Sequence, residues 1–313
     1  MIPVEQAHLK IAADSHTGLK GKNNEDQFSV SAYQLSVLDP TPSVFAIIAD
    51  GIGGHRAGEV ASAIAVEVVC QSVAESDASQ PVAIMQAAMI QASSTIHAQA
   101  SSDENKDGMG TTCVTAWVIG DRLYSASVGN SRLYLLRGGK LIHLNMDHTW
   151  VQEAVDAGAL TAEQARIHPH ANVIRRYLGS PQEVEVDTRL RTDRSARYSP
   201  DHQGQELRPG DRLLLCSDGL NDMIDDDRIQ ELARRGDLDA AVVDLIEAAN
   251  EAGGKDNITV ILLEHPKKKG LAGLAQSLRQ LKLQTLIAYA GLLVIGLGML
   301  TALALYLLEL FNG

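Results

Sequence analysis

Residues 45–51 read FAIIADG and residues 213–219 read LLLCSDG, so two short apolar runs each end in an aspartate followed by a glycine. Runs of this length and composition are typical of buried strands. A carboxylate at the end of a buried strand is held in a fixed direction and is costly to remove from water, so it favours a bound cation. The glycine allows a sharp turn and exposes a carbonyl oxygen as a further ligand. Asp50 and Asp218 therefore predict one shared metal site.

Two more acidic segments adjoin predicted strands, at residues 23–26 (NNED) and 255–257 (KDN). Together with the two Asp-Gly pairs they form a set of four in which every candidate ligand is an oxygen. Oxygen ligands select hard cations such as Mg²⁺ and Mn²⁺, and no His or Cys set at zinc spacing competes with them. Two such ions bridged by an aspartate would activate a water for attack on a phosphate ester. Singly, each acid would be an ordinary loop or capping residue.

The remaining pattern predicts an α+β fold, with a central β-sandwich of two mainly antiparallel sheets flanked by helices. Residues 168–205 are poorly periodic and indicate an inserted loop or flap. We expect hairpins, joined by turns at Gly120-Asp121 and Gly138-Gly139, that pair 111–119 with 122–128 and 131–136 with 140–144, and a last strand over 257–263. Helical spacing is found over 59–73, 81–98, 149–166 and 238–252.

The composition is that of a soluble protein except near the C-terminus. The chain has 313 residues and a net charge of −12, and an acidic body argues against nucleic acid as a main partner. Cys70, Cys113 and Cys216 stand in apolar surroundings without a common spacing, so we expect reduced cysteines in a core and a reducing cytosol. No pattern of a signal peptide opens the sequence.

Residues 286–308 form an uncharged run of 23 residues, which at about 1.5 Å per residue would span a hydrocarbon core of about 30 Å. We expect a transmembrane helix here rather than a buried core helix. The basic residues lie before it, which predicts a cytoplasmic body at the cell membrane. Residues 266–285 read as a basic juxtamembrane linker, either lying on the anionic membrane surface or serving as a plain tether. Residues 309–313 form a short tail.

Six motifs in order carry a resemblance to a known family: NNEDQF, ADGIGGHRAGEVAS, GMGTTCVTAW, VGNSRLYLLRGGKL, LLLCSDGLNDMI and GGKDNITVILL. Over residues 8–264 they resemble the bacterial form of the metal-dependent serine/threonine protein phosphatases (the PPM, or type 2C, family). The resemblance implies a phosphatase domain over residues 1–265, two Mn²⁺ or Mg²⁺ ions and phosphorylated proteins as substrates. It also implies a cognate serine/threonine kinase as a partner, whose phosphorylation the enzyme would reverse.

The resemblance also implies roles for individual residues. Asp50 would bridge the two ions and the Gly51 carbonyl would bind one of them. Asp218 and Asp256 would complete the shell of the first ion, and these two with Asp50 are the predicted catalytic residues. The remaining implied residues would support this centre: Glu25 would support the second ion through a water, Asp26 would stand behind the ligands, and Asn257 would orient the last loop.

Three departures from the family pattern bear on activity. The usual Gly-Asp-Ser-Arg motif reads Gly129-Asn130-Ser131-Arg132, and a neutral Asn130 should weaken a third metal site. The position of the arginine that binds substrate phosphate is Gly21, leaving Lys20 and Lys22 as candidate phosphate ligands without a bidentate fork. His16 replaces an aspartate that is common near the first strand.

His55 follows the glycine-rich loop after Asp50 and is a candidate general acid, although a hydrogen bond that fixes the loop is the alternative. The leading hypothesis is a membrane-anchored phosphoprotein phosphatase. The alternative is a pseudophosphatase that binds metal or phosphoproteins with little or no turnover, because of Gly21 and Asn130. A metal-dependent nuclease is a third class, which the acidic body disfavours.

Overall fold

The structure is a computed structural model, and it describes residues 1–20, 23–53 and 57–267. The chain divides into two units, Met1–Pro266 and Lys267–Gly313. The predicted transmembrane helix, most of the basic linker and the tail lie outside the described residues, as do Gly21, Lys22 and His55. The account below concerns the first unit.

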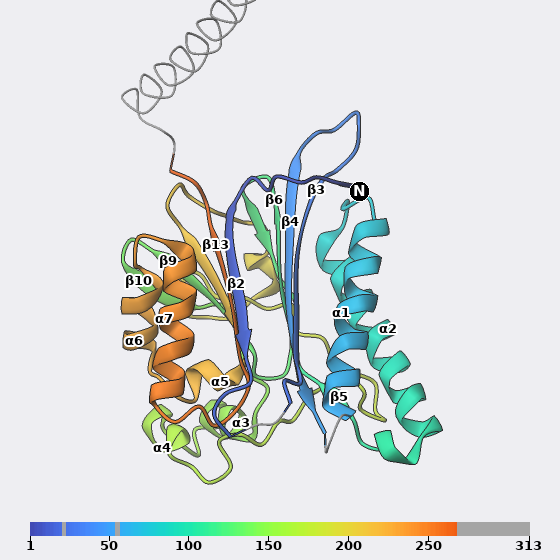
Figure 1. The fold of residues 1–313 in the computed structure, drawn as a ribbon, viewed down its shortest axis with the longest axis vertical. Coiled ribbons are helices and arrows are strands. Elements are labelled where there is room, and N and C mark those ends of the chain that lie inside the picture. The colour runs from blue at the N-terminus through green and yellow to red at the C-terminus, as the bar shows by residue number, and fades with distance from the viewer. Residues whose placement is uncertain (21–22, 54–56, 268–313) are drawn as a thin grey trace, which may run out of the picture. The chain divides into compact units, whose positions relative to one another are not determined.

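Two antiparallel sheets lie face to face in this unit (Figure 1). The first has the order β1-β3-β4-β6-β7-β11, with β5 paired to β4 and β8 paired to β6, and the second has the order β10-β9-β12-β13-β2. The strands are Ile2–Pro3 (β1), Lys10–His16 (β2), Asp26–Gln34 (β3), Pro42–Ile52 (β4), Gly110–Thr111 (β5), Cys113–Ile119 (β6), Arg122–Tyr124 (β7), Ser127–Val128 (β8), Arg132–Arg137 (β9), Lys140–His143 (β10), Gln205–Glu206 (β11), Arg212–Cys216 (β12) and Ile258–Glu264 (β13).

The two apolar runs that open the sequence analysis form central strands, because both of their faces are buried. In β4, Phe45 and Ile47 point into the core beneath the helices, whereas Val44 and Ile48 point into the core between the sheets. In β12 the same alternation holds, with Leu213 and Leu215 between the sheets and Leu214 and Cys216 on the outer face. Successive side chains of a strand point to opposite faces, so a strand covered on both sides needs an unbroken apolar run.

Helices cover the outer face of each sheet, giving four layers (Figure 1). Helices α1 and α2 pack on the first sheet, and α5, α6 and α7 pack on the second. Among the described residues α1 alone has the length and hydropathy of a membrane span, but it contributes Ala61, Ala65 and Val69 to the core beside β4. The helices are Ala57–Glu75 (α1), Pro81–Ser102 (α2), Trp150–Asp156 (α3), Ala162–Arg166 (α4), Asp218–Asn221 (α5), Asp226–Ala233 (α6) and Leu238–Glu251 (α7), with short 3-10 turns at Glu104–Lys106 and Pro200–His202.

The predicted α+β sandwich of antiparallel sheets is confirmed, while several elements differ from expectation. The single helix predicted over 149–166 is two short helices, because α3 ends at Asp156 and Thr161 begins α4 with a capping box to Gln164. The strand predicted over 122–128 is interrupted between β7 and β8. The sequence predicted strands near His16 and beside residues 23–26 but not the bounds of β2 and β3, because their sequences KIAADSH and DQFSVSAYQ mix polar residues into both faces.

Candidate metal centre

The carboxylates of the predicted site gather at one end of the sandwich, the lower end in Figure 1. Asp26 begins β3 and lies directly opposite Asp50 near the end of β4. Asp218 follows β12, and Asp256 precedes β13, the antiparallel neighbour of β12. Antiparallel pairing brings the end of one strand beside the start of the next, so four segments distant in sequence meet at this edge.

Asp50 is fixed by the strand that neighbours β4. Its backbone N–H donates to the Thr112 hydroxyl at 3.0 Å, and its carbonyl accepts from Thr111 Oγ1 and Thr112 N, both at 2.8 Å. Burial, together with the negative charges of Asp26, Asp218 and Asp256, raises the pKa of Asp50 well above its ordinary value. The neighbouring acids therefore act on one another electrostatically, as carboxylates of a single site must.

Asp26 is 4% exposed and stands behind Asp50. Its Oδ2 accepts hydrogen bonds from Ser217 Oγ at 2.7 Å and Thr259 Oγ1 at 2.6 Å, while its buried Oδ1 has no partner among the residues that the structure describes. Burial raises the pKa of Asp26 to about 6, against the effect of the two hydroxyl donors. Ser217 and Thr259 were not singled out from the sequence, although each lies beside a predicted site residue.

Asp218 opens the short helix α5 and is 9% exposed. The Asn130 side-chain amide donates to its Oδ2 at 2.8 Å, and the Asn130 Oδ1 is buried without a partner in the described part of the chain. Burial comes first among the causes that raise the pKa of Asp218 to about 7, followed by the charges of Asp222 and Asp256. Asn130 is thus in direct contact with a predicted ligand, in the position where the family pattern has an acid.

Asn257 joins three segments around Glu25 and Asp256. Its side-chain oxygen accepts from the Glu25 N–H at 2.7 Å, and its amide donates to the carbonyls of Thr17 and Asn23 at 3.1 and 3.0 Å. These bonds connect the loop before β13 to the segments that follow β2 and precede β3. Burial and the charges of Asp256, Glu59 and Asp26 raise the pKa of Glu25, so its carboxylate belongs to the same acidic cluster.

The glycine of each Asp-Gly pair lies where another segment leaves no room for a side chain. A Cβ on Gly51 would lie 2.4 Å from the Gly58 carbonyl oxygen and 2.7 Å from that of Glu25. A Cβ on Gly219 would lie 2.0 Å from the carbonyl oxygen of Asn257. The absence of a side chain at these two positions allows the acidic segments to approach one another closely.

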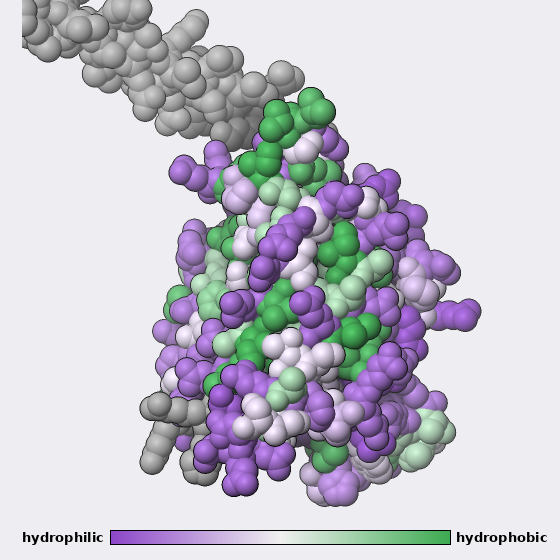
Figure 2. Space-filling model, turned by 90° about the vertical axis from the view of Figure 1, so that its right-hand side faces the viewer, coloured by the Kyte–Doolittle hydropathy of each residue, from purple (hydrophilic) through white to green (hydrophobic). Residues whose placement is uncertain are grey.

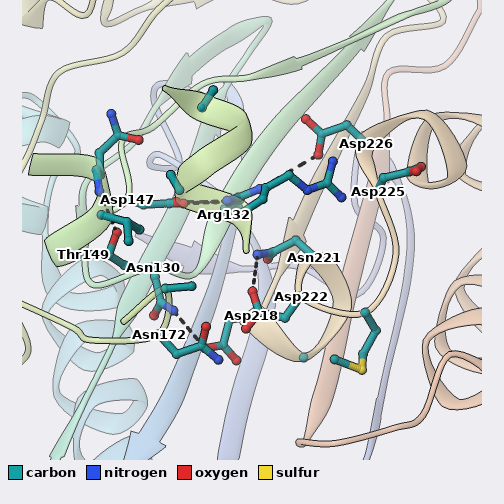
Figure 3. A pocket seen from close by; sticks show the side chains of 18 of the residues that line it. Asn130, Arg132, Asp147, Thr149, Asn172, Asp218, Asn221, Asp222, Asp225 and Asp226 are labelled. Carbon is teal, nitrogen blue, oxygen red and sulfur yellow. Dashed lines mark hydrogen bonds and ion pairs between the residues drawn. The ribbon is translucent and has the colours of Figure 1, made fainter. Parts of the chain in front are cut away.

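A cavity of about 480 Å³ adjoins the acidic cluster and contains Asn130, Asp218 and Asp256 in its lining (Figure 3). Its other walls come from α3, α4 and the segment 221–226. Arg132 and Asp147 pair within it at 2.6 Å, and although burial opposes ionisation, the Arg132 charge holds the pKa of Asp147 below its ordinary value. The sequence did not indicate this ion pair or the place of Asp222, whose pKa burial raises.

The structure says less about the predicted phosphate ligands, the candidate general acid and His16. Lys20 is exposed in the turn that follows β2. Lys22 and His55 lie outside the described residues, so their predicted roles stay predictions. The His16 ring accepts from the Gly18 N–H at 2.9 Å, which fixes the turn beside Asp256.

The donor set fits a hard divalent cation. Within the described ranges no three His, Cys, Asp or Glu side chains already enclose one point closely enough to hold an ion. Yet burial and neighbouring acids raise the pKa of Asp26, Asp50 and Asp218 together, and the polar donors on them are hydroxyls and an amide. As far as the structure describes the chain, this cluster has enough oxygen ligands but no positive charge to balance them. After small movements, the carboxylates could surround a Mg²⁺ or Mn²⁺ ion.

Comparisons with known proteins agree with this geometry. The family model described as protein phosphatase 2C matches residues 14–262. The chain is 36% identical over 256 residues to the serine/threonine protein phosphatase PstP of Mycobacterium tuberculosis, covering 82% of this chain but 45% of that protein. It is 35% identical to the serine/threonine phosphatase stp of Listeria innocua, covering 77% of this chain and 90% of the relative.

Solved structures give the same result for the fold. A serine/threonine phosphatase of S. agalactiae matches with a TM-score of 0.71 and 33% identity, covering 82% of this chain and 99% of that one. The catalytic domain of PstP in complex with two manganese ions matches with a TM-score of 0.65 and 35% identity, covering 82% of this chain and 97% of that one.

Proposed function

Because the chain belongs to the protein phosphatase 2C family, we propose that it hydrolyses phosphoserine and phosphothreonine in proteins with the help of two Mn²⁺ or Mg²⁺ ions. The observation that carries this proposal is the meeting of Asp26, Asp50 and Asp218 at the adjoining ends of β3, β4 and β12, where burial raises the pKa of each acid. Perturbed acids beside a cavity are typical of catalytic sites.

We assign Asp50 as the ligand shared by both ions, with the Gly51 carbonyl beside it. Asp218 and Asp256 would complete one shell, and Glu25 would hold the second ion. Asp26 lies directly across from Asp50 on β3, and its Oδ2 is held by Ser217 and Thr259, so it would orient the ligands from behind. Outer groups of this kind fix ligand direction and are needed for full metal affinity.

The protein's own residues would position the substrate and hold the ions, which when bound supply an activated water and neutralise charge on the phosphoryl oxygens. The cavity lined by α3, α4 and the segment 221–226 opens beside Asp218 and would receive the phosphorylated side chain and its neighbours. Lys20 and Lys22 are proposed to attract the phosphate as point charges, and His55 to donate a proton to the leaving oxygen.

Asn130 bears on a third, weaker ion. The nitrogen of its side-chain amide donates to Asp218, which leaves its neutral Oδ1 as the possible ligand atom. An aspartate at this position would offer a negatively charged carboxylate instead. We propose that a third ion binds weakly for this reason. Asn130→Asp should add a weak Mn²⁺-binding phase in calorimetry, and an unchanged binding curve would remove Asn130 as the cause.

The test of the main proposal is phosphate release by the purified chain from a phosphothreonine peptide and from p-nitrophenyl phosphate. Release should require Mn²⁺ or Mg²⁺ and stop with EDTA. If the chain binds Mn²⁺ by calorimetry but releases no phosphate, the pseudophosphatase alternative, a metal- or phosphoprotein-binding module, replaces the enzyme.

The cellular setting is also a proposal. The apolar run 286–308 and the basic residues before it support a single-pass anchor in the cell membrane, with residues 1–265 in the cytoplasm and opposing a membrane-associated serine/threonine kinase. Extraction of membranes with alkaline carbonate should leave the chain in the pellet, whereas a variant that ends at residue 265 should be released.

A further inference from the structure

His148 lies outside the predicted metal ligands, yet both of its ring nitrogens are in hydrogen bonds. The side chain is 3% exposed. The Gly129 N–H lies 3.0 Å from Nδ1, and the Asp187 Oδ2 lies 3.2 Å from Nε2. Because a backbone N–H can only donate, Nδ1 is the acceptor, and Nε2 carries the proton and donates to Asp187. The imidazole therefore joins two different parts of the chain.

The first part is the turn at residues 129–131, which lies between two predicted ligands. The His148 N–H also donates to the Gly129 carbonyl at 2.9 Å, so this turn is held by two bonds from one residue. On one side Asn130 donates to Asp218. On the other, the Ser131 hydroxyl bonds to Thr112 Oγ1 at 2.7 Å, and Thr112 Oγ1 accepts from the Asp50 N–H.

The second part is the segment 149–186, which carries α3 and α4 and lines the cavity with Thr149, Gln152 and Asn172. His148 directly precedes this segment and Asp187 directly follows it. The backbone of Asp187 exchanges two bonds of 2.9 Å with Ser127, and its carboxylate accepts from the backbone N–H and the guanidinium of Arg189. The segment is also held by isolated bridges and by Leu178, Val184 and Val186, which pack in the core beneath the helices, and the imidazole connects its two ends.

We propose that His148 is a positioning residue whose two hydrogen bonds serve different steps of the reaction. This inference rests on the proposed phosphatase function and concerns a residue that contacts neither a predicted ligand nor the reacting atoms. The bond to Gly129 fixes the turn between Asp50 and Asp218 and so supports metal binding and turnover. The bond to Asp187 fixes the segment 149–186 and so supports binding of the protein substrate.

Two substitutions separate the two bonds. His148→Asn offers an oxygen near the position of Nδ1, so it keeps an acceptor for Gly129 but does not reach Asp187. His148→Gln extends its amide toward the position of Nε2, so it keeps a donor for Asp187 but leaves the Gly129 N–H without an acceptor.

For His148→Gln in the full chain, we expect a drop in kcat of about tenfold on both p-nitrophenyl phosphate and a phosphothreonine peptide, with weaker Mn²⁺ binding in calorimetry. For His148→Asn, we expect KM for the peptide to rise more than kcat falls, together with faster hydrogen exchange of residues 149–186. Mn²⁺ affinity and hydrogen exchange are readouts that do not depend on activity.

His265→Gln is the matched control, because His265 Nε2 also bonds to an aspartate, Asp121, at 2.8 Å, but at the opposite end of the sandwich. We expect it to leave KM, kcat and Mn²⁺ affinity as in the wild type. If His148→Asn fails to fold, Asp187→Ala should reproduce its pattern, because alanine offers Nε2 no acceptor.

The proposal would be overturned if the two His148 variants changed kcat, KM and Mn²⁺ affinity to the same extent. It would also be overturned if the variants lowered the melting temperature and changed nothing else. Failure of the phosphatase function itself would be seen differently, as a wild-type chain without phosphate release. Mn²⁺ calorimetry and hydrogen exchange would still test the two bonds in that case.

Discussion

Buried carboxylates have opposite electrostatic surroundings at the two ends of the sandwich. At the end away from the site, Glu264 pairs with Arg212 at 2.7 Å and with Lys10 at 2.6 Å. Burial opposes its ionisation, but these hydrogen bonds and charges lower the pKa of Glu264. At the site end, Asp26 and Asp218 receive only hydroxyl and amide donors from the described residues, and their pKa values are raised.

The same two strands contribute to both ends. Arg212 of β12 lies directly opposite Glu264 of β13, whereas Asp218 and Asp256 flank the other end of this strand pair. One end is therefore neutralised within the chain, and the other end remains short of positive charge. The comparison suggests that charges in the first region serve stability and those in the second serve ion binding. On the face that Figure 2 shows, the side of α1 and α2, polar residues surround several patches of apolar residues.

The largest effect should come from Asp50→Asn. Loss of the shared carboxylate should lower Mn²⁺-dependent turnover of p-nitrophenyl phosphate by more than about 100-fold, because ion and activated water are weakened together. Stability in EDTA should not fall, since one of several repelling charges is removed. A variant that keeps near wild-type turnover would remove Asp50 from the centre.

Next in size is Arg212→Leu at the opposite end. This change removes the buried partner of Glu264 and leaves the exposed Lys10 as its remaining charged partner, so it should lower the free energy of unfolding by about 3 kcal/mol in denaturant titration. Turnover per folded molecule should stay at the wild-type level. Reduced turnover in the folded fraction would show that the two ends are coupled.

The pH dependence of stability should come from the site end. The pKa of Asp26 is raised to about 6 and that of Asp218 to about 7, from about 4 in the unfolded chain. The native state then binds more protons than the unfolded chain between about pH 4 and 7, so in EDTA the free energy of unfolding should fall as pH rises through this range.

Excess Mn²⁺ should reverse this trend, because the ion binds the deprotonated carboxylates. Asp218→Asn should flatten the slope in EDTA. Urea titrations at several pH values between 4.5 and 7.5 give the measurement, and stability that increases with pH in EDTA would contradict the assignment.

The smallest effect should come from Lys10→Ala. Lys10 pairs with the same Glu264 as Arg212 does, but its side chain is 61% exposed, so solvent screens the pair. We expect a loss below about 1 kcal/mol that diminishes in high salt. A loss as large as that of Arg212→Leu would mean that Lys10 provides the main neutralising charge.

Sequence could predict the ends of central strands well. In β4 and β12 an unbroken apolar run is required by two buried faces, and the Asp-Gly that follows marks the edge. The sequence was less informative for β2 and β3, where polar residues stand on both faces, and for α3 and α4, where local capping at Thr161 ends one helical pattern and starts another.

At the site, the acids were predictable and their surroundings were not. Asp50, Asp218 and Asp256 could be chosen because of their motifs, whereas the bonds from Ser217 and Thr259 to Asp26, or from His148 to Gly129, depend on how distant segments pack. These contacts join strand ends and loops that lie far apart in the sequence, and the periodicity of a single sequence does not specify which loops meet.

The close approach at the two Asp-Gly pairs has a consequence for inactivation. A methyl group at Gly219 would meet the carbonyl of Asn257, and one at Gly51 would meet that of Gly58, so an alanine at either position would act as a wedge between acidic segments. Formal charge and every carboxylate would be preserved. A related protein could thus lose catalytic activity through a glycine substitution while it keeps every acidic residue of the site. A sequence search that checks only the aspartates would classify such a protein as active.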